Sequence, residues 1–166
     1  LFNLGAVAME RGEFAKAIPL LRLSLAGSAP SDSITRKLRA LLARAHQSLG
    51  DTTAALAICV AGLRQDPDDA ELLFRKGMVH RARGESSSAR CCWEQVRSLR
   101  RPLQFASLDM GIYGHLTSRN LAILAEEGGD PPLAIEYWRD VLSELPQDRA
   151  ALESLSRLGR IVGDHG

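Results

Sequence analysis

Two carboxylates one residue apart, Asp66 and Asp68, come nearest in this sequence to a metal-ligating motif, because such a pair can chelate a divalent cation. The same neighbourhood recurs, however, as Pro30 to Asp32, Pro67 to Asp69 and Pro146 to Asp148, each just before an expected helix. An Asp there accepts hydrogen bonds from free backbone N–H groups and favours the helix dipole. We therefore interpret these residues as helix caps and predict no metal site.

Histidine and cysteine give no stronger chemical signal. The residues concerned are His46, His80, His115, His165, Cys59, Cys91 and Cys92. The cysteines have neither the even count of a disulfide framework nor metal-ligand spacing, so we expect buried, reduced thiols. No Ser/His/Asp arrangement, phosphate-binding glycine loop or pair of catalytic carboxylates stands out. The sequence therefore predicts no catalytic residue, no metal and no cofactor.

The composition indicates that helices position any functional residues. Leu and Ala supply 26 and 22 of the 166 residues, whereas Val, Ile and Thr together supply 17. Leu and Ala are good helix formers, and β-branched residues favour strands. With 45% apolar residues the chain can also bury a core. We expect an all-α protein.

The charge balance argues against two classes of partner. The chain has 21 basic and 20 acidic residues, so no overall field attracts nucleic acid or an anionic membrane. The longest apolar run, residues 54–63, is far shorter than the about 20 residues of a membrane span. We expect a cytoplasmic protein with no nucleic-acid or membrane partner. Because residues 1–4 already read as the middle of a helix, we expect a fragment of a longer chain.

An internal repeat organises the sequence. Its turn glycines are Gly12, Gly50, Gly84 and Gly129, its alanines five residues later are Ala17, Ala55, Ala89 and Ala134, and its prolines are Pro30, Pro67, Pro102 and Pro146. From glycine to proline the separations are 18, 17, 18 and 17 residues, and the basic unit is 34 residues. Glycine, alanine and proline at constant spacing within a unit of this length are typical of stacked helical hairpins.

The sequence resembles the tetratricopeptide repeat family over nearly its whole length. The resemblance implies a right-handed superhelical solenoid of antiparallel helix pairs, with repeats at about 1–31, 32–68, 69–102 and 115–147, a half repeat at 148–163 and an insertion at 103–114. Gly5 and Gly77, inside expected first helices, would let the paired helix approach closely, and Trp93 and Trp138 would pack in the core. Arg39 and Ser118 stand where the family prefers a large aromatic residue, and Lys76 stands where it prefers Leu, so these three positions depart from the family's packing.

In this family the first helices line a concave groove that binds peptides or helices. Carried over by place in the repeat, the groove candidates are Phe2, Asn3, Lys37, Arg44, Gln47, Phe74, Arg75, Met78, Arg81, Arg119, Asn120, Arg157 and Arg160. Arginine interleaved with aromatic and Met side chains suits a peptide with carboxylates and an apolar anchor. An ordinary solvated face is the alternative. Phe2 and Ala6 stand where the family's clamp for chaperone carboxylates needs Lys and Asn, which argues against that partner.

The insertion carries a narrower resemblance. Its aromatic residues, Ser107-Leu108-Asp109, its glycines and the following Asn120-Leu121-Ala122 resemble the tetratricopeptide tail of bacterial family-two glycosyltransferases. That resemblance implies an upstream catalytic domain and a non-catalytic scaffold here, with Phe105, Asp109 and Tyr113 presenting a surface to the transferase domain or its protein acceptor. A packed loop that only changes the pitch is the alternative.

Three further alternatives stay open at this level. The chain could be a stand-alone adaptor that binds a peptide segment in its groove. It could be an enzyme if Asp109 and His115 converged in one pocket. It could bind RNA as related helical repeats do, although Arg44, Met78 and Ile123, at comparable places, do not form a consistent reading set. We favour a protein or peptide partner.

Overall fold

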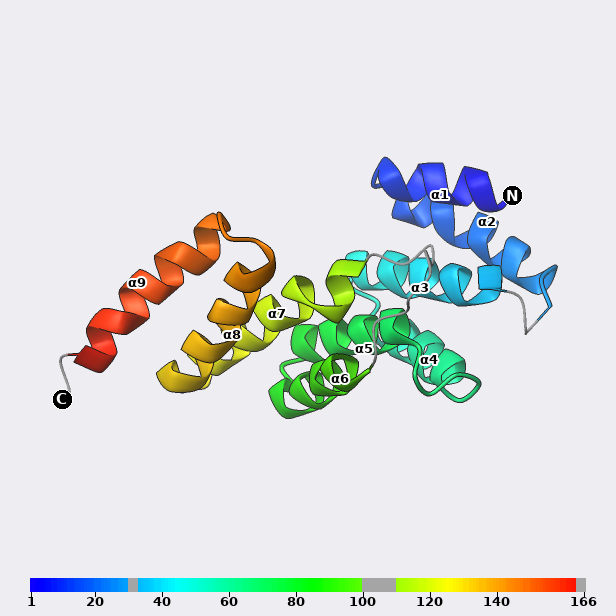
Figure 1. Cartoon of the computed structure of the whole chain (residues 1–166). Helices are drawn as coiled ribbons and strands as arrows, with labels where there is room; N and C mark the ends of the chain where they lie inside the picture. The colour runs from blue at the N-terminus through cyan, green and yellow to red at the C-terminus, as the bar shows by residue number, and fades with distance from the viewer. Residues whose placement is uncertain (30–32, 100–109, 164–166) are drawn as a thin grey trace. The chain divides into compact units, whose positions relative to one another are not determined.

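A computed structural model describes residues 1–29, 33–99 and 110–163, and all the regular elements in those ranges are helical (Figure 1). In chain order they are α1 (Phe2–Glu10), α2 (Phe14–Ala26), α3 (Ser33–Ser48), α4 (Thr52–Leu63), α5 (Ala70–Ala82), α6 (Ser86–Ser98), the 3₁₀ turn η1 (Met110–Tyr113), α7 (His115–Glu127), α8 (Pro131–Glu144) and α9 (Arg149–Gly163). The expectation of an all-α protein is confirmed.

The turn glycines end each first helix for a conformational reason. Gly12, Gly50, Gly84 and Gly129 have φ values of 71°, 79°, 75° and 71°, in the left-handed region that L side chains rarely adopt. A Cβ at any of them would meet nothing within 4 Å, so the requirement is backbone conformation and not space. These four turns are the ones that the repeat spacing predicts.

Aspartates begin several helices, as the sequence indicates. Asp69 Oδ1 accepts a hydrogen bond from the Leu72 backbone N–H at 3.0 Å, and Asp148 Oδ1 accepts one from Ala151 at 2.9 Å. Their role as helix caps is confirmed. Asp32 lies outside the described residues. Asp51 and Asp130 cap α4 and α8 in the same way, which the sequence analysis did not single out.

The chain divides into two compact units, and the first comprises Leu1–Ala89. Here α1 packs on α2 and α3 on α4, while α2 also packs on α3, α4 on α5, and α3 lies beside α5. Gly5 lets α1 approach α2, since a Cβ there would stand 2.7 Å from Leu21 Cδ2. The core between the first three helices contains Ala8, Met9, Ala17, Leu21, Leu38, Leu42 and Ala45.

The second unit comprises Arg90–Gly166. In it η1 packs on α7, α7 on α8, and α8 on α9. Trp93 and Trp138 are buried, which confirms their predicted packing role. The Arg97 guanidinium lies 4.9 Å from the centre of the Tyr137 ring and forms an ion pair with Asp140 at 2.7 Å. Through Arg97, α6 is therefore joined to α8.

The structure corrects one expectation and adds detail to others. Cys59 and Cys92 are buried, but Cys91 is exposed, because its place on α6 points away from the core that Cys92 and Trp93 enter. Ser118 is buried, whereas Arg39 and Lys76 are half-buried. Among the helices that the structure describes, none combines the length and the hydropathy needed to cross a membrane.

Candidate functional site

Helix α3 carries charge of one sign. Its cationic side chains are Arg36, Lys37, Arg39 and Arg44, and its sequence contains no Asp or Glu. Arg36 Nη1 pairs with Asp66 Oδ2 at 3.2 Å, and Arg39 Nη1 donates to Gln65 Oε1 at 2.8 Å. Lys37 and Arg44 have neither a hydrogen bond nor an ion pair within the described part of the chain. They are the cations of α3 left available to a partner.

Lys37 and Arg44 lie on one side of α3. They are seven residues apart, which is two helical turns and about 10 Å along the axis. Lys37 is half-buried and Arg44 is exposed. Gln47, one turn beyond Arg44, is half-buried. The three predicted groove residues of α3 are thus accessible to different extents.

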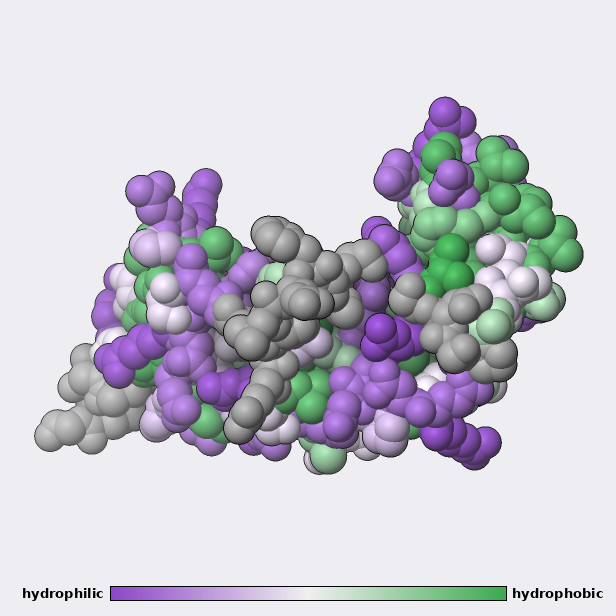
Figure 2. Space-filling view, turned by 45° about the vertical axis from the view of Figure 1, so that its right-hand side comes forward, coloured by the Kyte–Doolittle hydropathy of each residue, from purple (hydrophilic) through white to green (hydrophobic). Residues whose placement is uncertain are grey.

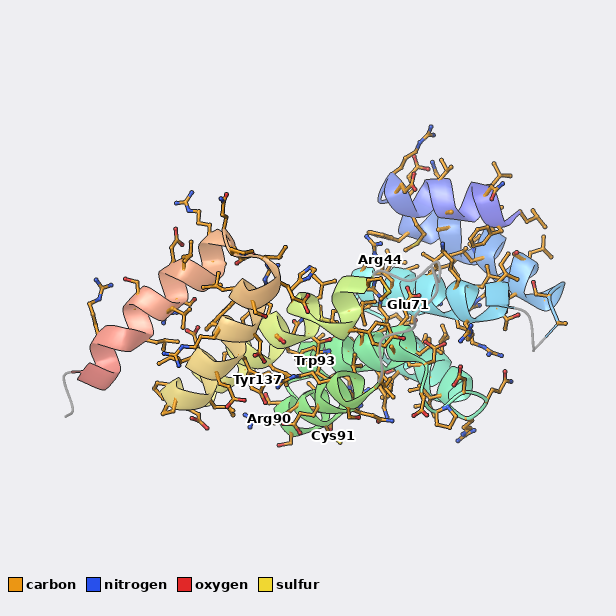
Figure 3. All side chains as sticks on the ribbon, in the orientation of Figure 1. Arg44, Glu71, Arg90, Cys91, Trp93 and Tyr137 are labelled. Carbon is orange, nitrogen blue, oxygen red and sulfur yellow. The ribbon has the colours of Figure 1, made fainter. Side chains whose placement is uncertain are left out.

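Helix α5 lies beside α3 and also carries more basic than acidic side chains. It carries Arg75, Lys76 and Arg81 against one carboxylate, Glu71. Met78 and Arg81 are half-buried. Figure 3 labels Arg44 on α3 and Glu71 near the start of α5. We name the accessible parts of Lys37, Arg44, Gln47, Met78 and Arg81 the α3–α5 surface.

Phe74 contributes less to this surface than its predicted role requires. Its side chain is only 7% exposed, and the Arg75 guanidinium lies 5.9 Å from the centre of its ring. An aromatic ring covered in this way presents little area to a ligand. Met78 is the more accessible apolar side chain of α5.

In the second unit Arg119, Asn120 and Arg157 are held by internal contacts, whereas Arg160 is exposed on α9 and forms no ion pair with the described residues. Arg119 Nη2 pairs closely with Asp148 Oδ2, which joins α7 to the start of α9. The Asn120 amide donates to the Leu116 carbonyl of its own helix at 2.8 Å. Arg157 pairs with Glu126, whose other oxygen accepts from Trp138 Nε1 at 2.6 Å. These side chains connect helices, and the Arg119 Nε is buried without a partner.

Each histidine of the first unit pairs with an acidic residue of the turn that follows it, and the sequence analysis missed this recurring arrangement. His46 Nδ1 lies 3.1 Å from Asp51 Oδ2, and His80 Nδ1 lies 2.5 Å from Glu85 Oε2. Each pair spans one turn glycine, so a His and an acid five residues apart around that glycine was the available signal. His46 Nε2 also lies 3.2 Å from Arg22 Nη2, which connects α2 to α3. Both rings are mainly buried, as the packing interpretation predicts.

Two carboxyl groups in these turns titrate at lower pH than usual. The Ala54 backbone N–H, and after it the hydrogen bond with His46, lowers the pKa of Asp51. The hydrogen bond with His80, followed by that from Arg83, lowers the pKa of Glu85. In contrast, burial raises the pKa of the Asp69 carboxyl, partly offset by the Leu72 N–H. Both low-pKa carboxyl groups fix helix termini and so stabilise the hairpin turns.

The predicted insertion surface is described only in part. Phe105 and Asp109 lie outside the described residues, so the contacts of these two side chains and the suggested meeting of Asp109 with His115 stay predictions. Tyr113 is half-buried at the end of η1. η1 is held on α7 by the Thr117 hydroxyl, which donates to the Ile112 carbonyl at 2.5 Å. His115 contacts Glu144 of α8 through its backbone N–H and its Nδ1.

Of the two carboxylates one residue apart, Asp66 pairs with Arg36 and Asp68 is exposed, while the neighbouring Asp69 caps α5. Among the described residues, no group of three or more His, Cys, Asp or Glu side chains is arranged to hold a metal ion.

A tetratricopeptide repeat family model matches residues 36–79, which include most of α3, all of α4 and most of α5. Solved structures similar to the chain include MamA, with a TM-score of 0.73, 16% identity and coverage of 96% of this chain and 84% of that one. A tetratricopeptide repeat protein from Parabacteroides merdae ATCC 43184 has a TM-score of 0.69 and 20% identity, with 98% and 57% coverage. A thermophilic TPR protein of Thermus thermophilus has a TM-score of 0.59 and 16% identity, with 95% and 96% coverage.

No curated protein matches the chain by sequence. At these identities the structural similarity establishes the fold alone. The chain has an all-α, tetratricopeptide-like helical repeat fold.

Proposed function

We propose that this chain is a non-catalytic protein-interaction scaffold that binds an extended, acidic segment of another protein on its α3–α5 surface. The observation that carries the proposal is the pair of Lys37 and Arg44, which lie on one side of α3 without an ion-pair partner among the described residues. Folds built from such repeats are typically used for protein recognition, and the charge of this surface specifies an anionic partner.

The spacing of the two cations fits an extended peptide. Lys37 and Arg44 lie about 10 Å apart along the axis of α3. Three residues of a polyproline II segment span about 9 Å and bring side chains i and i+3 to the same side. Two carboxylates three residues apart could therefore contact both side chains. Arg44 can form a bidentate pair with a carboxylate, and Met78 offers an apolar contact on the neighbouring helix.

The expected affinity is modest because the cations are in contact with water. Solvent-exposed ion pairs contribute about 0.2–1 kcal/mol each and weaken with salt. Specificity would then depend on several weak contacts along the surface.

The test uses a fluorescent ten-residue peptide with two aspartates three residues apart beside a leucine. We expect Lys37→Ala combined with Arg44→Ala to weaken its binding about three- to tenfold in fluorescence anisotropy. Arg149→Ala, which removes an arginine whose side chain is 91% exposed on α9, is the matched control and should leave binding unchanged. Equal affinities of the double variant and the wild type would contradict the proposal, as would equal binding of a peptide with lysines in place of the aspartates.

The parent protein is a second question, for which we propose a glycosyltransferase whose catalytic domain or protein acceptor docks on this region. The support is the glycosyltransferase resemblance of the insertion, together with the hydrogen bond from Thr117 to Ile112, which attaches the described end of the insertion, with Tyr113, to α7. The full reading frame of the gene decides between this parent and a stand-alone adaptor.

If a transferase domain is present, Phe105, Asp109 and Tyr113 are the residues to substitute in the full-length protein. Loss of transfer with unchanged helical content supports docking through the insertion. Unchanged transfer in the triple variant rejects it and leaves the insertion with a structural role.

A further inference from the structure

The imidazole ring of His46 connects α3 to the elements on both sides of it in the sequence. Its Nδ1 lies 3.1 Å from Oδ2 of Asp51, the residue that caps α4. Its Nε2 lies 3.2 Å from Nη2 of Arg22, on α2. The His46 side chain is 8% exposed, so the ring is largely shielded from water. One ring therefore links α3 to the helix before it and to the turn after it.

The two contacts together define the protonation state of the ring. A guanidinium group has donors only, so His46 Nε2 accepts from Arg22 and carries no proton. The Ala54 backbone N–H, as the largest cause, lowers the pKa of Asp51, and this carboxyl group therefore stays ionised near neutral pH. Nδ1 then carries the proton of the ring and donates it to Asp51. The neutral Nδ1–H tautomer is the form of His46 that satisfies both partners.

A second proton on the ring would keep one contact and break the other. Both nitrogens of an imidazolium donate, so Nδ1 would still donate to the Asp51 carboxylate. The Nε2–H would point at the N–H groups of Arg22, a group of the same charge. Arg22 is exposed on α2, so its guanidinium can move into water. Histidine is the side chain that ordinarily changes its charge between about pH 5 and pH 8.

His80, at the equivalent place in the next repeat, meets no such conflict. Counted from the positive-φ glycines, His80 corresponds to His46, and each is followed five residues later by its acid. The place of Arg22, ten residues after the preceding turn glycine, is occupied in α4 by Val60. A valine neither donates a hydrogen bond to the ring nor repels a proton on it. The cation beside the ring therefore distinguishes His46 from His80.

Few other charges lie near His46. Figure 2 shows hydrophobic side chains gathered over α1 and α2, and α4 carries no acidic or basic side chain. Within the part of the chain that the structure describes, the His46 ring has no hydrogen bond or ion pair besides those with Arg22 and Asp51. It pairs neither with the cations of α3 named above nor with the remaining charged residues and histidine of the helices that pack on α3, which are Glu10, Lys16, Glu71, Arg75, Lys76, His80 and Arg81.

We propose that His46 is a pH-sensitive switch in the contact between α2 and α3, in which proton uptake at Nε2 releases Arg22 and leaves the ring paired with Asp51. The hairpin of α1 and α2 is then held on α3 chiefly by apolar side chains such as Leu21 and Leu38. It separates from α3 more readily in mild acid than at neutral pH. This device lies apart from the α3–α5 surface and requires no ligand.

The test is hydrogen–deuterium exchange of α2, measured by mass spectrometry at about pH 7.5 and about pH 5.5 and corrected for the intrinsic pH dependence of exchange. We expect the protection of α2 in the wild type to fall about three- to tenfold at the lower pH. Arg22→Gln should abolish this response, because a glutamine amide can donate to a bare Nε2 or accept from a protonated one. Circular dichroism checks that the variant remains helical. Arg11→Gln, at an exposed arginine of the same unit, is the matched control and should respond as the wild type does.

Nitrogen NMR of the imidazole rings tests the premise directly. We expect His46 at about pH 7.5 to carry its proton on Nδ1. A proton on Nε2 at that pH would overturn the proposal, because Arg22 could not then donate to the ring. Wild-type protection that does not change with pH would also overturn it, as would an Arg22→Gln variant that responds as much as the wild type. Neither measurement involves the acidic peptide, so the proposed function stands or fails separately.

Discussion

The first helices of the two units carry cationic groove candidates but use them differently. In the first unit, Lys37 and Arg44 have no ion-pair partner in the described ranges. In the second, Arg119 pairs with Asp148 and Arg157 with Glu126. A cation whose neighbours satisfy it stabilises the fold, whereas one left to solvent is available for binding. The contrast concerns Arg119 and Arg157; Arg160 of α9 is exposed without an ion pair among the described residues, and Arg36 of the first unit pairs with Asp66.

The largest expected effect follows from Asp148, which has two roles in the second unit. Asp148→Ala removes both the cap of α9 and the partner of Arg119, and we expect it to lower the free energy of unfolding by about 2–4 kcal/mol. Both tryptophans lie in this unit, so tryptophan fluorescence in urea reports its unfolding. Asp148→Asn keeps a capping oxygen and should lose less. If the two variants were equally stable, the cap would contribute nothing beyond the Arg119 pair.

Glu126 is a second acid that holds helices of the second unit together, and its substitution should cost less stability. Glu126→Ala leaves the Trp138 Nε1–H without its acceptor, and we expect a loss of about 1–3 kcal/mol. Glu126→Gln can still accept from Trp138 and loses only the ion pair with Arg157, whose side chain is 54% exposed, so it should cost at most about 1 kcal/mol. A Gln variant as unstable as the Ala variant would make the ion pair, and not the Trp138 hydrogen bond, the main contribution.

The first unit has two His–acid pairs across its turns, His46 with Asp51 and His80 with Glu85. The lowered pKa of Glu85 predicts how the stability of the second pair's turn depends on pH. His80 and then Arg83 lower the pKa of Glu85 in the folded state. Because the folded pKa lies below the unfolded value of about 4.3, the stabilisation is present above that pH and is lost as the pH falls through the folded pKa. Thermal unfolding followed by circular dichroism should show Glu85→Gln less stable than wild type at pH 6, with the difference shrinking below about pH 4.

Glu10→Gln is the matched control for this pH series. Glu10 is an exposed glutamate of the same unit, and none of the described hydrogen bonds or ion pairs involves it. Its substitution should leave the pH profile unchanged. A difference between Glu85→Gln and wild type that stayed constant from pH 6 to pH 3 would point to lost packing and not to lost charge.

The local features of the fold were predictable from the sequence because they depend on residues close together in it. Gly12, Gly50 and their equivalents mark the turns through a backbone conformation that glycine adopts readily. Asp69 and Asp148 could be identified as caps because the N–H groups that they bind lie three residues away. The burial of Trp93 and Trp138 could also be predicted, because both stand at the large apolar position of the repeat.

The candidate site was predictable only in part, because pairing depends on helices a whole repeat apart. Arg44, Arg119 and Asn120 were proposed together as groove residues, yet Arg119 finds its acid 29 residues later. Arg36 finds Asp66 30 residues later, so a separation just short of the 34-residue repeat brings a first helix beside the next turn. At the same distance from Arg44 stand Leu73, Phe74 and Arg75, and no acid. Lys37 nevertheless has Asp66 29 residues later and does not pair with it, because Asp66 pairs with Arg36, so this separation alone does not distinguish a binding cation from a structural one.

The smallest expected effect on stability belongs to the residues proposed to bind. Lys37→Ala combined with Arg44→Ala removes no hydrogen bond or ion pair that the structure describes, so the free energy of unfolding should change by less than about 0.5 kcal/mol. Arg119→Ala, the comparison from the second unit, removes a pair whose side chains are 32% and 12% exposed and should cost about 1–3 kcal/mol. Urea unfolding followed by circular dichroism measures both. If the double variant lost as much stability as Arg119→Ala, Lys37 and Arg44 would be structural residues, and any weaker peptide binding would reflect a damaged fold. If both variants were as stable as wild type, the ion pairs of the second unit would not stabilise it, and the contrast between the units would concern binding alone.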